Sequence, residues 1–434
     1  MMQKLFSLVF AALLPLTAAA ESAPIQRWQT ADGTRVLLVE RHDNPIVDIH
    51  IAFDAGSARD RADKIGVAGF TAALMDAGTR RLDEEALHER GSDLAVSLGS
   101  YGGTERAGVA LRSLSKPEVL APAVALMRDI LVEPRFDPAV LRREQDRAVA
   151  SLKQNLTRPE YLSHRAAAEL NYGAHPYGFV ARSSERSIRA VSVADMRAFH
   201  RRHFTRRNAV IAMVGDLDRS RAEAIVAQLT RDLPVGTALP AVPAPTERSG
   251  GQRHLPHPES QTHIRLTLPL IRYNDPDYYP LLVGNYILGG GGFDSRLMQT
   301  LRDRHGYTYG VSSDLAPMRQ PGPFSISFAT EKANAQAALA ATRQVLADFI
   351  AQGPTEAELA QAKANLVGSF PLRFDTNAEL TGYLIQIGFG NLPDDFLTRY
   401  PAAVAAVSTE DIRQAWQRRL QAEKLNTVTV GAPQ

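Results

Sequence analysis

The stretch GVAGFTAALMDAGT, residues 66–79, is the part of the chain that says most about its fold. Val67, Phe70 and Leu74 recur at helical spacing and predict a face that packs against a core. The neighbouring face of the same helix is made of small or acidic residues: Gly69, Ala72, Ala73 and Asp76. The pattern therefore predicts a helix that packs closely against its surroundings.

The frame of this stretch resembles the motif helix of the inverted-zinc-motif peptidases, the family of pitrilysin, insulin-degrading enzyme and the mitochondrial processing peptidase. The resemblance rests on three pieces: Gly66-Val67-Ala68, Leu74-Met75 and Gly78-Thr79. In that family the helix carries H-x-x-E-H, whose two His bind zinc while the Glu polarises the zinc-bound water. Aligned without a gap, those positions fall on Gly69, Ala72 and Ala73, which can neither coordinate zinc nor move a proton.

The family's third zinc ligand, a Glu on a later helix, is also missing. In the helix predicted over 138–154, the matching position is Ala150 or Ser151, and the nearest acids are Glu144 and Asp146. The resemblance implies that ligands and base have been lost together, as in a non-catalytic paralogue. We therefore expect no metal and no other cofactor in this chain.

Two histidine pairs are alternative candidates for a metal site: His200 with His203, and His254 with His257. Neither pair has a carboxylate at ligand spacing, and a pair without a fuller motif is a weak signal. The first pair flanks two arginines, which is typical of a solvated basic helix end. We expect neither pair to hold a functional metal.

The chain repeats itself once. Residues 191–197, VSVADMR, are echoed 216 positions later by residues 407–413, VSTEDIR. Similar offsets relate two further pairs of segments: 50–51 with 263–264, and 214–215 with 430–431. A nearly constant offset of half the mature chain indicates duplication into two homologous domains.

The boundary between the repeats is predicted at residues 233–251, LPVGTALPAVPAPTERSGG, because Pro and small residues favour an extended linker. We expect a signal peptide at 1–20, an N-terminal domain with the degenerate zinc motif at 21–232 and a C-terminal domain at 252–434.

Strand patterns at both ends of each repeat enclose long helical stretches. This order predicts an α+β fold of two homologous domains, each a mixed, mostly antiparallel sheet with helices packed on one face. The resemblance implies that the two domains form half of a clamshell.

The second half carries a glycine-rich segment, ILGGGGFDSRL, at residues 287–297. Four glycines permit close backbone approach or turns with positive φ. No Lys-Ser/Thr follows them, which argues against a phosphate-binding loop. The candidate substrate-binding residues in this segment are Gly290, Gly291, Gly292 and Phe293.

Arg302 and Tyr309 are the candidate catalytic residues. The resemblance places them where active members have an Arg and a Tyr, seven positions apart, that reach from the second half towards the scissile carbonyl. A guanidinium and a phenol can both donate to a carbonyl oxygen that becomes negative in the transition state. The alternative is structural, with Arg302 in a charged helix end and Tyr309 on one face of a strand with Tyr307 and Val311.

The first 20 residues have the pattern of a signal peptide: Lys4, an apolar run at 5–16 and alanines at 18–20. The run is too short to span a bilayer and no later segment approaches that length, so we expect export without a membrane anchor, most simply to a bacterial periplasm.

Zero cysteines exclude disulfides, a thiolate zinc site and a Cys nucleophile. With 49 basic and 47 acidic residues and no basic block, nothing predicts binding to nucleic acid.

These features and the resemblance together predict a non-catalytic subunit. It would bind an extended peptide by adding a strand to a sheet edge. It would form a heterodimer with a zinc-carrying chain of the same family and supply Arg302 and Tyr309 to that chain's active site. Two alternatives remain: a peptide-holding or structural protein with no part in proteolysis, and independent catalysis by a Ser nucleophile, for which no G-x-S-x-G elbow is present.

Overall fold

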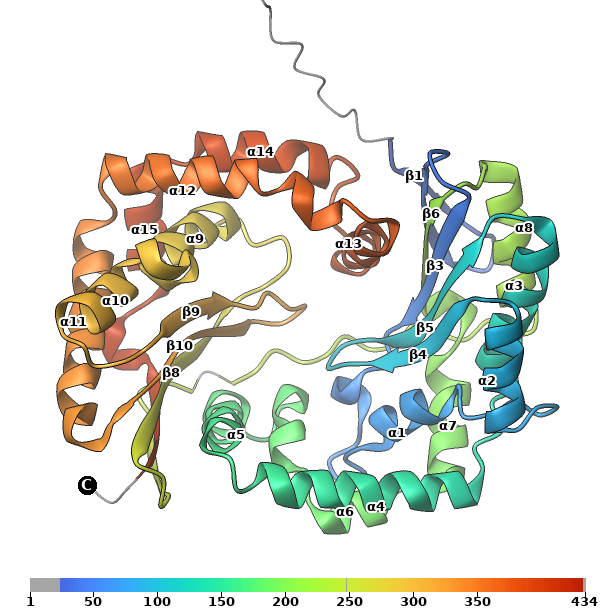
Figure 1. Ribbon diagram of the computed structural model, residues 1–434, viewed down its shortest axis with the longest axis horizontal. Helices are drawn as coiled ribbons and strands as arrows, with labels where there is room; N and C mark the ends of the chain where they lie inside the picture. Colours follow the sequence, from blue (N-terminus) through green and yellow to red (C-terminus); the bar gives the residue numbers. More distant parts are fainter. Residues whose placement is uncertain (1–23, 247, 432–434) are drawn as a thin grey trace, which may run out of the picture.

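The computed structural model describes residues 24–246 and 248–431, and the predicted signal peptide lies outside them. Two β-sheets occupy the two sides of the molecule, each built from one half of the chain, with helices around them (Figure 1). The predicted α+β fold of two sheet-containing domains is confirmed.

The first sheet has six strands in the order β1-β2-β6-β3-β5-β4. Their bounds are β1 Gln26–Gln29, β2 Arg35–Glu40, β3 Ile46–Phe53, β4 Ser97–Gly102, β5 Ala107–Leu114 and β6 Ala209–Gly215. Only β2 and β6 pair in parallel, and the other neighbours are antiparallel. Every residue of β6 is buried, as expected of a central strand covered on both faces.

The second sheet has five strands in the order β7-β11-β8-β10-β9. Their bounds are β7 Gln252–Pro256, β8 Gln261–Ile271, β9 Val311–Leu315, β10 Gly322–Glu331 and β11 Asn426–Gly431. Here β7 and β11 pair in parallel and the rest are antiparallel. Strand for strand this order matches β2-β6-β3-β5-β4, so the predicted duplication and the mostly antiparallel sheets are confirmed.

Helices follow the same repeat. In the first half they are α1 Val67–Leu74, α2 Glu84–Asp93, α3 Pro117–Val132, α4 Pro138–Asn155, α5 Pro159–Tyr172, α6 Glu185–Arg189, α7 Val193–His203 and α8 Arg219–Thr230. In the second half they are α9 Tyr278–Asn285, α10 Arg296–Met298, α11 Ala335–Gln352, α12 Glu356–Gly368, α13 Asn377–Gly390, α14 Phe396–Ala406 and α15 Thr409–Arg419. The first sheet carries α3 on β5 and α8 on β2. Short turns η5 Tyr286–Gly290, η6 Gly292–Asp294 and η7 Gln299–Arg304 connect α9 and α10 to β9.

The two echoed sequence segments form the same local structure. Ser192 and Ser408 cap α7 and α15, and each accepts a hydrogen bond from the backbone N–H of the acid three residues later. The carboxylates of Asp195 and Asp411 accept in return from the cap backbone, which completes a capping box in both copies. Each helix then leads into the strand that pairs in parallel, β6 or β11.

The inner face of each sheet is covered by a helix from the opposite half. Helix α13 packs on β6, β3 and β2, while α5 packs on β8 and β11 (Figure 1). Leu37 and Val210 of the first sheet consequently belong to the buried apolar cluster of the second half. On the other side, Ala166 and Ala167 of α5 join a cluster with Val428 of β11. Each half therefore needs the other to bury its sheet.

A buried polar cluster also joins the two halves. Arg59 donates to Asp54 Oδ1 over 2.7 Å, and Arg319, from the loop between β9 and β10, forms an ion pair with the same carboxylate. Burial raises the pKa of Asp54, but the hydrogen bond from Arg59 and the charge of Arg319 lower it by more, so the carboxylate stays ionised. Glu105 accepts from the Tyr177 hydroxyl over 2.5 Å and from the Arg319 N–H over 3.0 Å.

Between α8 and β7 the chain forms neither helix nor strand at any described position. This segment is held by both halves, since His175 Nε2 lies 2.8 Å from Pro243 O and Gln320 donates to Val242 O over 2.7 Å. The division of the chain at 233–251 stays a prediction.

Gly388→Ala should destabilise the protein because α13 lies very close to the first sheet. An added Cβ would stand 2.5 Å from Val210 Cγ1 and 3.0 Å from Leu37 Cδ1, and such overpacking costs about 1–3 kcal/mol. Gly382→Ala is the matched control, because a Cβ there meets no atom within 4 Å and Ala favours a helix by up to about 1 kcal/mol. Urea-unfolding midpoints should move in opposite directions, and equal shifts would contradict the packing described for α13.

Candidate functional site

Helix α1 is anchored at its first turn by Asp60. The Asp60 carboxylate accepts from Gly66 N over 2.7 Å and from Ala68 N over 2.8 Å. Burial raises the pKa of Asp60 to about 6, although both backbone hydrogen bonds favour the charged form. Gly66 precedes the helix with φ 104°, a conformation that a side chain disfavours. These contacts explain the Gly-Val-Ala start of the motif helix without reference to a metal.

The three degenerate ligand positions lie on α1 as predicted by the alignment. Gly69 and Ala73 are exposed and one helical turn apart, and a Cβ at Gly69 would meet nothing within 4 Å. Ala72 is buried, and a Cβ on Gly102 of β4 would lie 2.9 Å from its methyl group. The exposed face of α1 therefore offers no side-chain atom for a metal at these positions.

The corresponding part of α4 also lacks a carboxylate that could bind zinc. Ala150 and Ser151 are exposed. The nearby acids are engaged elsewhere: Glu144 accepts from Arg143 over 2.9 Å, and Asp146 pairs with Arg189 over 2.5 Å. Neither acid is free to replace the missing ligand.

His200 and His203 are core residues of α7. His200 Nε2 lies 2.9 Å from Leu131 O, and its ring stacks on Phe204 with centroids 4.9 Å apart. His203 stacks on Phe199 with centroids 4.3 Å apart. Burial lowers the pKa of both imidazoles to about 4. The expectation of a solvated basic helix end was wrong for this pair, because aromatic neighbours enclose both rings.

The second histidine pair is divided between different partners. His254 Nδ1 lies 2.8 Å from Thr429 Oγ1, whereas His257 Nε2 lies 3.0 Å from Thr157 O. Within residues 24–246 and 248–431, no three acidic or histidine side chains gather in a way that could hold a metal ion.

The glycine-rich segment brings two predicted site residues together. A Cβ on Gly291 would lie 2.8 Å from Tyr286 O, and Gly292 has φ 66°, so neither position readily accepts a side chain. The turn leaves Phe293 65% exposed. The Arg302 guanidinium carbon stands 4.5 Å from the centre of the Phe293 ring, a cation–π contact. The two candidate segments therefore form one surface.

Tyr309 is 90% exposed and lies before β9, which begins at Val311. Its neighbour Thr308 is buried and donates to Ala329 O over 2.7 Å, so the chain is fixed on one side while the phenol points outward. The structural alternative, with Tyr309 packed on the face of a strand, was wrong. The catalytic role of Arg302 and Tyr309 stays a prediction.

Comparison with known proteins places this architecture in a family. Residues 35–177 match the family described as insulinase (peptidase family M16), and residues 190–366 match the peptidase M16 inactive domain. The crystal structure of a peptidase M16 inactive domain from Pseudomonas fluorescens is 35% identical, with a TM-score of 0.91 over 94% of this chain and 98% of that chain. This chain belongs to the peptidase M16 family. The resemblance inferred from residues 66–79 is confirmed.

Two more distant relatives show the range of this M16 family. The non-peptidase homolog YmxG from Helicobacter pylori is 25% identical over 83% of both chains. The mitochondrial-processing peptidase subunit beta from Blastocladiella emersonii is 22% identical, covering 96% of this chain and 92% of the relative. The M16 fold thus occurs both in a named peptidase subunit and in a named non-peptidase.

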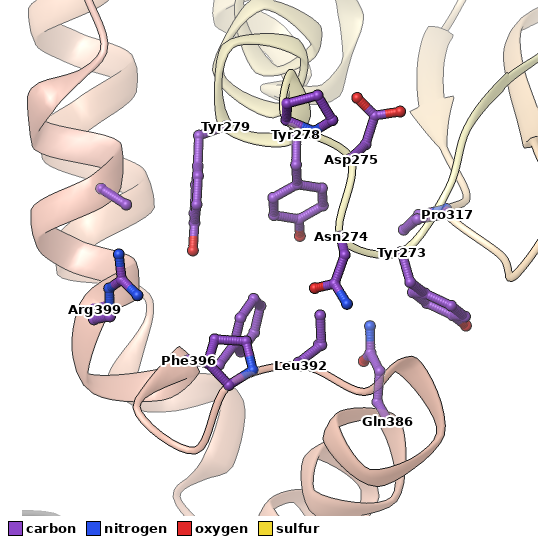
Figure 2. Close-up of a pocket in the computed structure, with 13 residues that line it drawn as sticks. Tyr273, Asn274, Asp275, Tyr278, Tyr279, Pro317, Gln386, Leu392, Phe396 and Arg399 are labelled. Carbon is purple, nitrogen blue, oxygen red and sulfur yellow. The ribbon is translucent and has the colours of Figure 1, made fainter.

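This M16 chain also has a cavity of about 290 Å³ in its second half that motif reasoning missed. Figure 2 shows Tyr278 and Tyr279 directed into it, opposite Phe396. Burial raises the pKa of both tyrosines. The signal in the sequence is the aromatic and proline-rich run YNDPDYYP, residues 273–280. The lining of the cavity combines four aromatic residues with prolines, Leu392 and Ala403, and suits an apolar group.

The double substitution Gly69→His/Ala73→His should create a zinc site, because two His four positions apart on a helix face one metal. We expect zinc affinity at least about tenfold above that of the single variant Gly69→His, measured by titration of the apo protein. The unmodified chain should retain no stoichiometric zinc after dialysis. Chelator-sensitive, stoichiometric zinc on the unmodified chain would contradict the account of α1.

The neutral state of His200 and His203 predicts acid sensitivity. Their folded pKa of about 4 lies below the unfolded value of about 6.5, so the unfolded state binds protons first as pH falls. Stability should therefore be complete above pH 6.5 and decline towards pH 4, by up to about 1.4 kcal/mol per pH unit for each group. His200→Phe should flatten the pH dependence of the unfolding midpoint in this range, and an unaltered slope would contradict the assignment.

Proposed function

We propose that this chain is the non-catalytic subunit of a periplasmic zinc metallopeptidase. It binds peptide and contributes Arg302 and Tyr309 to the active site of a zinc-carrying partner chain of the same family. The observation that supports the proposal is an asymmetry. The exposed face of α1 carries no metal-binding side chain at the motif positions, whereas Arg302 and the exposed Tyr309 are present where the resemblance expects the family's Arg and Tyr.

The geometry of the single chain favours action on another chain. Helix α1 lies in the half opposite to α10, which directly precedes Arg302, and the two helices stand on opposite sides of the molecule (Figure 1). A side chain beside α10 is therefore poorly placed to contribute to an active site at α1 of the same chain. Pairing of two such chains into a clamshell would set the second half of one against the first half of the other.

The chemistry of the two side chains fits transition-state stabilisation. The phenol of Tyr309 is open to an approaching substrate, and Arg302 is held in place by its contact with Phe293. Both groups donate hydrogen bonds and could place them at a carbonyl oxygen as it gains negative charge. Neither transfers a proton in this proposal, because the water-activating base would belong to the partner.

Peptide would bind beside this surface. The strand β9 follows Tyr309 and forms one edge of the second sheet, so an extended peptide could add to it by backbone hydrogen bonds. The turn at Gly290, Gly291 and Gly292 allows close approach of a peptide backbone, with Phe293 as an apolar contact.

The sequence and one relative support the proposed compartment and assembly. The predicted signal peptide would deliver the chain to the periplasm, and none of the helices in the described part of the chain has the length and hydropathy of a membrane span. One relative is named as a subunit of a processing peptidase, which supports a heterodimer in which the partner carries the zinc.

A second function is a peptide-holding or structural protein with no part in proteolysis. The name of the Helicobacter pylori relative, a non-peptidase homolog, favours it. The two functions differ in what copurifies from the native periplasm: the subunit role predicts a chain with an intact H-x-x-E-H helix.

Arg302→Ala and Tyr309→Phe should each lower peptide hydrolysis by the reconstituted pair by about 10²–10³ in kcat, because each removes a donor to the developing oxyanion. The measurement is kcat and KM with a fluorogenic peptide. Arg304→Ala is the matched control, since Arg304 is an exposed arginine of the same turn η7. Unchanged turnover in the two test variants, or equal losses in all three, would remove the claimed role.

A further inference from the structure

A cavity of about 220 Å³ lies where α5 crosses the inner face of the second sheet. It is lined by residues of α5, by residues of β8 and β10, and by Thr104, Tyr177, Val180 and Ala181. The cavity is separate from the surface of Arg302 and Tyr309 and from the degenerate helix α1.

Arg265 of β8 lines this cavity and lacks a hydrogen-bond partner for one of its buried nitrogens. Its Nε is buried and has no hydrogen-bond partner. Burial lowers the pKa of the guanidinium, and the charge of Asp314 offsets only part of that effect. Leaving a buried charged donor unpaired costs considerably more than leaving a neutral one, so this side chain is poised for an anionic acceptor.

A second guanidinium enters the same cavity from α5. Arg165 donates from Nη2 to Ser183 O over 2.6 Å, but its Nη1 is buried without a partner. His164 also lines the cavity, and partial desolvation and the charge of Arg265 lower the pKa of its imidazole. None of the ion pairs formed by residues 24–246 and 248–431 involves Arg165 or Arg265.

The rest of the lining combines apolar side chains, among them Ala167, Ala181, Met318 and Pro323, with three tyrosines and a few small polar residues. A guanidinium holds a carboxylate through two parallel hydrogen bonds, and the apolar walls suit a short carbon stem behind it. A free inorganic anion would leave these apolar walls uncovered.

We propose that this cavity is a carboxylate-binding pocket that takes the free C-terminal end of a peptide. Arg265 and Arg165 receive the carboxylate, and the alanine, methionine and proline side chains contact the terminal residue. The pocket is complete within one chain, so it does not rest on the proposed subunit role.

The test is binding of fluorescein-labelled tetra-alanine, as the free acid and as the C-terminal amide, to the mature full-length chain by fluorescence anisotropy. The free acid should bind at least about tenfold more tightly than the amide, because the charge-assisted hydrogen bonds are lost with the carboxylate. Arg265→Met and Arg165→Met should each reduce affinity for the free acid at least about tenfold and leave the amide unchanged.

The matched control is Arg231→Met, because the Arg231 side chain is 73% exposed and lies outside the cavity; it should bind the free acid like the unmodified chain. Arg265→Lys keeps the charge and loses the planar fork, and it serves in place of Arg265→Met if that variant does not fold. Equal binding of acid and amide, or full affinity in the Arg265 and Arg165 variants, would overturn the proposal. Binding of inorganic phosphate in the cavity without binding of the free-acid peptide would overturn the carboxylate assignment.

Discussion

The reciprocal packing of α13 on the first sheet and of α5 on the second is the constraint on which the rest of the structure depends. Each sheet has helices of its own half on one face. Without the helix of the opposite half, the apolar side chains of the other face would be exposed to water. Arg35 adds a direct tie by donating to Gly388 O of α13 over 2.7 Å. The cavity beside α5 takes its shape from this packing, because residues of α5, β8 and β10 line it.

The same packing explains how the zinc motif can degenerate without loss of the fold. Helix α1 begins at backbone contacts with Asp60 and is fixed by apolar residues such as Val67 and Leu74. The ligand positions Gly69 and Ala73 face outward and contribute nothing to the core. Because the metal side of α1 and its core side are different faces of one helix, selection could change the first and preserve the second.

Much of the fold was predictable because local sequence patterns determine its helices, strands and repeat. The echo of residues 191–197 at 407–413 indicated the duplication, and the motif around residues 66–79 indicated the family. The exchange of α5 and α13 was not predictable, since only tertiary contacts assign these helices to the sheet of the opposite half. The presence of Arg165 and Arg265 in one cavity was missed for a similar reason: the two residues are far apart in sequence and neither belongs to a motif.

The central claim is that Tyr309 acts on another chain. The most direct measurement is photo-crosslinking from a benzoylphenylalanine placed at position 309 in the native periplasm, with the captured peptide identified by mass spectrometry. The account predicts a crosslink to a second M16 chain, at or beside a helix with an intact H-x-x-E-H sequence. Crosslinks confined to the first half of this same chain, or to no M16 chain at all, would contradict it.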